Sequence, residues 1–124
     1  MADPAATQAL NDYRAGVGLP PLSYSATLEK AATGHALDMA RKGFFDHTGS
    51  DGSGVAQRVE RVGYGWCFVA ENIAKGQGSL SRVMADWAAS PGHRRNMLDR
   101  RAQEFALVEG PERVWVMVLA APGC

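Results

Sequence analysis

The fold is decided by one apolar run near the middle of the chain, Trp66-Cys67-Phe68-Val69-Ala70-Glu71-Asn72-Ile73-Ala74. Aromatic and β-branched residues dominate this run, which is typical of a buried β-strand. Glu71 interrupts it, and a carboxylate inside such a strand must be paired, hydrogen-bonded or turned towards a cavity. We therefore expect a strand that carries a cation-paired glutamate in its middle.

Two helices are predicted on the amino-terminal side of this strand. Asp3 and Pro4 suit an N-cap and a first helical residue, and apolar residues then recur at helical spacing up to the glycine- and proline-rich segment 16–21. Ser25 caps a longer helix, which Gly43 ends.

The other elements follow from turn residues and periodicity. Gly76 and Gly78 end the strand, and the residues Ser90-Pro91-Gly92 break the helix that follows it. We predict an exposed loop over 44–54, a short helix over 55–62, a helix from Ser79 or Ser81, and a hairpin of strands 105–109 and 113–120 joined through Gly110-Pro111.

This order predicts an α+β fold with helices packed on a small antiparallel sheet, in a single domain over residues 1–124. The chain weighs 13.2 kDa, with 13 Lys plus Arg against 13 Asp plus Glu. Zero net charge argues against a nucleic-acid partner. The uncharged stretches are shorter than the roughly 18 residues of a transmembrane segment, so none is expected.

The two cysteines, Cys67 and Cys124, are predicted to form a disulfide. Such a bridge persists in an oxidising compartment. The first residues have neither the basic region nor the apolar core of a signal peptide. We therefore expect an exported protein whose leader has been removed before Met1.

Two of the three histidines are candidates for function. His47 lies in the glycine-rich loop, and His93 follows the breaker at 90–92, so both are predicted to be loop residues. Two imidazoles near Glu71 suit a divalent metal with an open position, or an acid-base pair oriented by the carboxylate. For each of these histidines, capping of a loop is an equal alternative to a functional role. For Glu71, the alternative is a buried structural hydrogen bond to backbone amides. His35 lies on the apolar stripe of its helix, where a core histidine bonded to a backbone carbonyl is expected.

An ordered set of motifs resembles the CAP superfamily of cysteine-rich secretory proteins, antigen five and plant pathogenesis-related proteins, in its compact bacterial SCP-like form. The resemblance spans about residues 8–123. The motifs are Leu10-Asn11-Asp12-Tyr13-Arg14, Gly18-Leu19-Pro20-Pro21-Leu22, Ala31-Ala32-Thr33-Gly34-His35-Ala36, Phe45-Asp46-His47-Thr48, Ala70-Glu71-Asn72-Ile73-Ala74 and Ser90-Pro91-Gly92-His93-Arg94-Arg95-Asn96-Met97-Leu98.

The resemblance implies a three-layer α-β-α sandwich, a secreted or periplasmic location, and a central cleft whose two histidines bind zinc in some members. His47 and His93 match the cleft histidines, and Glu71 matches the glutamate of the Glu-Asn motif. Larger members carry a second cleft glutamate shortly after a helix tryptophan, and that position is Ser90 here. The complete set of two histidines and two glutamates is therefore not expected, while a two-histidine metal site remains.

Three functions follow as hypotheses. The leading one is a non-enzymatic, exported binding domain, whose cleft of His47, Glu71, Ser90 and His93 takes a divalent metal such as zinc at the histidines and a small-molecule, lipid or protein ligand. The first alternative is a metal-dependent hydrolase, such as a protease, with Glu71 and His93 as catalytic candidates. It would need three protein ligands and a separate base, and the chain offers no obvious set. The second is a sterol or lipid carrier with an apolar groove between helices.

Overall fold

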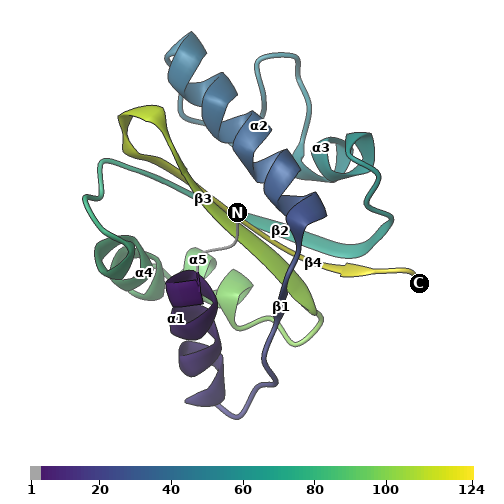
Figure 1. Cartoon of the computed structure of the whole chain (residues 1–124), viewed down its shortest axis with the longest axis vertical. Coiled ribbons are helices and arrows are strands. Elements are labelled where there is room, and N and C mark those ends of the chain that lie inside the picture. The colour runs from purple at the N-terminus through teal and green to yellow at the C-terminus, as the bar shows by residue number, and fades with distance from the viewer. Residues whose placement is uncertain (1–3) are drawn as a thin grey trace.

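The computed structural model describes residues 4–124 and contains a four-stranded sheet between two layers of helices (Figure 1). The sheet order is β1-β3-β4-β2. β1 pairs with β3 in parallel, and the other neighbours are antiparallel. The elements are α1 (Pro4–Ala15), β1 (Ser23–Tyr24), α2 (Ala26–Lys42), α3 (Val55–Arg61), β2 (Trp66–Lys75), α4 (Leu80–Ala88), α5 (Pro91–Met97), β3 (Glu104–Gly110), the 3-10 turn η1 (Pro111–Arg113) and β4 (Val114–Pro122).

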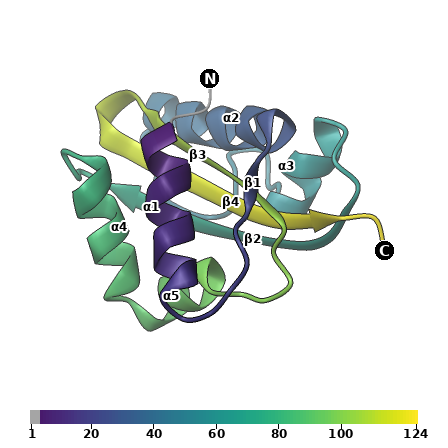
Figure 2. The same ribbon diagram turned by 60° about the horizontal axis from the view of Figure 1, so that its bottom comes forward.

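The two helical layers cover opposite faces of the sheet (Figure 2). Alternate residues of β4 show the division. Trp115, Met117 and Leu119 belong to the core beneath α1, α4 and α5, whereas Val116 and Val118 belong to the core beneath α2 and α3. β4 is thus buried on both faces, which explains its near-continuous apolar sequence. The three-layer α-β-α sandwich is confirmed.

Local sequence signals set the helix ends. The hydroxyl of Ser25 accepts a hydrogen bond from the amide of Leu28, and Gly43 adopts the left-handed conformation that ends α2. Ser79, rather than Ser81, caps α4. The predicted cap at Asp3 lies outside the described residues. The two-residue strand β1 was not predicted, because so short an edge strand has no periodicity to detect.

One buried arginine joins the end of α1 to the end of α5. Arg14, at the end of α1, is fully buried and donates hydrogen bonds to the carbonyl oxygens of Pro20, Met97 and Asp99, each at 3.0 Å. Burial lowers the pKa of its guanidinium. Because two of these acceptors lie at the end of α5, Arg14 fixes the end of that helix against α1, and His93 lies on the same helix.

The predicted disulfide is present. Cys67, on β2, is bonded to Cys124, just after the end of β4, and their Cα atoms are 5.2 Å apart. The bridge joins two antiparallel neighbours at the end of the sheet. No helix in the described part of the chain, residues 4–124, is both long and apolar enough to cross a membrane.

Candidate functional site

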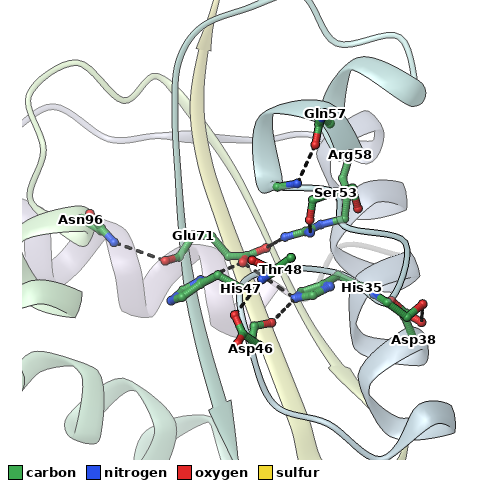
Figure 3. A network of polar contacts seen from close by, with 12 residues as sticks. His35, Asp38, Asp46, His47, Thr48, Ser53, Gln57, Arg58, Glu71 and Asn96 are labelled. Atoms are coloured by element: carbon green, nitrogen blue, oxygen red, sulfur yellow. Dashed lines mark hydrogen bonds and ion pairs between the residues drawn. The ribbon is translucent and has the colours of Figure 1, made fainter.

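Glu71, on β2, is the centre of a polar network that includes side chains of α3 and of the loop over 44–54 (Figure 3). Its side chain is 2% exposed. One carboxylate oxygen, Oε2, accepts a hydrogen bond from Nη2 of Arg58 at 2.8 Å, and the other, Oε1, lies 2.9 Å from Nδ1 of His47. The expectation of a cation-paired glutamate is confirmed, and both partners come from segments outside the strand.

Arg58 reaches Glu71 from α3, the short helix packed on β2. The guanidinium is itself buried, and its Nη1 donates to the carbonyl oxygen of Ser53 at 2.7 Å. Arg58 therefore connects the start of α3 to the strand. A buried carboxylate needs such charge-assisted hydrogen bonds to offset its lost hydration.

The loop over 44–54 holds His47 in place through local hydrogen bonds. Ser50 donates from its amide and its hydroxyl to the two carboxylate oxygens of Asp38, at 2.8 and 2.6 Å. The Asp46 carboxylate accepts from the amide of Thr48 at 2.9 Å. Gly49 is buried, and a Cβ atom there would lie 2.8 Å from Oγ of Ser53. The loop is thus a tightly packed support for His47.

His35 has the structural role that its sequence position indicated. Its ring is buried, and Nε2 lies 2.8 Å from the carbonyl oxygen of Asp46. The acceptor is a carbonyl, so Nε2 carries the proton and donates it. Burial is the main reason that the pKa of His35 is lowered, which favours the neutral ring. His35 therefore fixes the loop residue that precedes His47.

His93 lies on a helix, and the prediction of a loop residue was wrong. Ser90 is the N-cap of α5 and Pro91 is its first residue, so the segment that ends α4 also begins the next helix. Ser90, the remaining cleft candidate, makes no capping hydrogen bond with its side chain. The His93 ring lies 6.5 Å from that of Trp87, centroid to centroid.

Two asparagines attach α5 to the strand beside Glu71. Asn72 donates through Nδ2 to the carbonyl oxygen of His93 at 3.1 Å. Asn96 donates to the Asn72 side-chain oxygen at 2.9 Å and to the backbone carbonyl of Glu71 at 3.3 Å. These bonds place His93 beside the network that holds His47.

The electrostatics differ between the two histidines. The hydrogen bond to Glu71 is the largest cause of a raised pKa at His47, whose side chain is 58% exposed. Burial lowers the pKa of His93, and the positive charge of His47 lowers it further. As the pH falls, His47 is therefore protonated before His93, and a neutral His93 remains available as a ligand or hydrogen-bond acceptor.

The residues present fit a metal only as a two-histidine site. Within residues 4–124, no group of three or more His, Cys, Asp or Glu side chains is arranged to hold a metal ion. The contact between Glu71 and Nδ1 leaves Nε2 of His47 turned away from the carboxylate, the arrangement in which a carboxylate orients a metal-binding imidazole. His93 would be the second protein ligand, and solvent or a bound ligand would supply the rest.

Arg58 was not predicted as a site residue. It lies outside every motif named above, and its role depends on α3 packing against β2, which periodicity does not specify. The sequence pointed to it only indirectly, because a glutamate inside an apolar strand needs a cationic partner. The two cations nearest in sequence on the flanking short helix are Arg58 and Arg61, and only Arg58 turns inward.

A three-layer α-β-α domain with histidines on both sides of a buried Glu-Asn pair is the arrangement of the CAP domain. The model of the cysteine-rich secretory protein family matches residues 7–110, and the chain belongs to this family. A curated relative, the uncharacterized protein YkwD of Bacillus subtilis, is 36% identical over 89 residues. The match covers 72% of this chain and 35% of YkwD, so the chain spans about a third of that relative.

Solved structures share the fold. An extracellular protein of Bacillus anthracis that contains an SCP domain superposes with a TM-score of 0.89 at 22% identity, over 94% of this chain and 39% of that one. An outer surface protein of Borrelia burgdorferi superposes with a TM-score of 0.87 at 20% identity, over 96% of this chain and 91% of that one. Both relatives carry names of extracellular or surface proteins.

Proposed function

We propose that the chain is an exported binding domain, and that His47 and His93 bind a divalent metal such as zinc together with a small or extended ligand. The bond between Cys67 and Cys124 supports export, because a disulfide persists outside the reducing cytoplasm. The extracellular or surface location in the names of the structural relatives supports it as well.

One observation carries the binding proposal: Glu71 is engaged on both oxygens. Arg58 bonds one oxygen and His47 the other. Glu71 therefore orients the imidazole of His47 and stabilises its proton at Nδ1. The other nitrogen, Nε2, is then a lone-pair donor at an exposed side chain, suited to a metal ion or a hydrogen-bonding ligand.

The same observation argues against the hydrolase. A zinc hydrolase needs a metal-bound water, usually three protein ligands and a nearby base. Glu71 is the one buried carboxylate of this network, and its ion pair with Arg58 opposes its use as a base. The sterol or lipid carrier stays a prediction; among the described residues, the large apolar side chains with high exposure are Val17, Phe45 and Trp66.

Calorimetric titration of oxidised, chelator-stripped protein with zinc tests the proposal. We expect a dissociation constant of about 10 µM, as befits two protein ligands, and loss of binding in both His47→Ala and His93→Ala. Arg94→Ala, at an exposed neighbour on α5, is the matched control and keeps the wild-type affinity. Glu71→Gln is expected to weaken binding by about tenfold or more, because the imidazole loses its orienting carboxylate.

Two results would contradict the proposal. Folded wild-type protein that releases no heat with zinc excludes the metal site. Binding that survives either histidine substitution shows that the metal lies elsewhere. Circular dichroism of every variant confirms that the comparison is made between folded proteins.

A further inference from the structure

A cavity of about 300 Å³ lies on the α2 side of the network, between that helix, the loop 50–53 and α3. Its lining residues do not include His47 or His93. It shares Arg58 with the network, and in Figure 3 Arg58, Ser53, His35 and Asp38 lie on the side of the network away from Asn96. The volume is at the lower end of the range for small-molecule sites.

Gly34 keeps this cavity open. It lies in the interior of α2, where glycine destabilises a helix relative to alanine. A Cβ atom at Gly34 would meet no atom within 4 Å, so no close packing requires a glycine here. Because Gly34 lines the cavity, a longer side chain at this position would enter it.

The cavity carries charges of both signs along its length. Lys30 and Asp38 flank Gly34 on the same face of α2, one turn before and one turn after it, about 12 Å apart along the axis. Across the cavity, Arg61 pairs with Asp51 at 2.6 Å. The positive charge of Arg58 is already balanced by Glu71 on its far side. A purely anionic ligand would meet Asp38, and a purely cationic one would meet Lys30.

One residue of the lining carries a buried polar atom without a partner in the described part of the chain. His35 lines the cavity, and its Nδ1 is buried with no hydrogen-bond partner among residues 4–124. Nε2 donates to the carbonyl oxygen of Asp46, so Nδ1 of the neutral ring is an acceptor. A buried acceptor of this kind calls for a donor, which an ammonium or amide group, or a water bound with it, would supply.

We propose that this cavity binds a small zwitterion of amino-acid or dipeptide size, with its carboxylate towards Lys30 and its ammonium group towards Asp38. Lys30 and Asp38 carry opposite charges on the two sides of Gly34, whose missing side chain leaves space between them. These charges match the carboxylate and the ammonium group at the two ends of such a ligand. The site is separate from the proposed metal site, although Arg58 lies between them.

Nuclear magnetic resonance tests this proposal on ¹⁵N-labelled, oxidised protein in buffer that contains a chelator, so the result does not depend on zinc. The probe is glycylglycine, and the controls are N-acetylglycine, which is only anionic, and glycinamide, which is only cationic. We expect saturable amide shifts at Gly34, Asp38, Ser50 and Ser53, with a dissociation constant of about 1 mM, and at least about tenfold weaker binding of either control.

Substitution of Gly34 supplies the matched pair of variants. Gly34→Gln places a side chain in the cavity while favouring the helix, and it should weaken glycylglycine binding by about tenfold or more. Gly34→Ala adds only a Cβ atom and should keep the affinity within about threefold of wild type. The proposal is overturned if glycylglycine causes no saturable shifts at these residues, if N-acetylglycine or glycinamide binds equally well, or if Gly34→Gln has no effect.

Discussion

The buried ion pair between Arg58 and Glu71 gives the sharpest prediction for stability. Their side chains are 9% and 2% exposed, and the charged atoms are 2.8 Å apart. Removal of one partner leaves the other charge buried, which costs about 3 kcal/mol in comparable pairs. We expect Arg58→Met and Glu71→Leu each to lower the free energy of unfolding by about 3 kcal/mol.

The double variant, Arg58→Met with Glu71→Leu, separates the energy of the ion pair from the energy lost with each side chain's other contacts. With both charges gone, no unpaired ion remains in the core, and the two apolar side chains roughly fill the space. We therefore expect the double variant to cost about 3 kcal/mol rather than about 6, a coupling of about 3 kcal/mol. A domain of this size has a stability of about 5–15 kcal/mol, so each protein should still fold.

Urea unfolding at neutral pH, followed by tryptophan fluorescence, measures these differences as shifts of the midpoint at constant slope. The control lies on the same helix, since Arg61→Met breaks an exposed ion pair with Asp51 and should leave the midpoint unchanged within error. Additive effects of Arg58→Met and Glu71→Leu, or single costs below about 1 kcal/mol, would refute the argument that each ion is held by the other.

Three further predictions concern pH, the disulfide and the β-hairpin turn. Burial lowers the pKa of His35, so its contribution to the free energy of unfolding is complete above the ordinary pKa of about 6.5 and is lost as the pH falls through the folded-state pKa. His47 has a raised pKa, so its contribution to the free energy of unfolding is complete below about pH 6.5 and is lost as the pH rises through the folded-state pKa. Wild-type protein should therefore lose stability to urea as the pH rises above about 6.5, and His47→Asn should remove this loss; an equal loss in His47→Asn would contradict the assignment to His47. The bond between Cys67 and Cys124 closes a separation of 57 residues, so its removal by paired serine substitutions should cost up to about 4 kcal/mol in urea, and labelling of the denatured, unreduced protein should find no free thiol. Glu112 has φ 60° in the turn between β3 and β4, so Glu112→Gly should raise the thermal midpoint, by about 0.5 kcal/mol in stability, whereas a lowered midpoint would show that its side chain stabilises the turn.

Much of the fold could be predicted because its signals are local. The serine before α2 and the glycine after it fix that helix within its own sequence, and β2 is a mainly apolar run rich in aromatic and β-branched residues. His93 was placed wrongly because Pro91 was treated only as the end of one helix, although proline at the first position also begins helices. Only the family resemblance implied that His93 lies near His47, because periodicity does not specify the docking of α5 through Asn72 and Asn96.

The candidate site could be predicted in its residues but not in the role of its carboxylate. A glutamate between two histidines suits a base, a ligand or an orienting group equally well while its partners are unknown. Arg58 favours the orienting role, because it occupies one carboxylate oxygen of Glu71 and leaves the other oxygen to His47. The choice between catalysis and binding at this site therefore depends on an arginine 13 residues earlier in the chain, brought to the strand only when α3 packs against it.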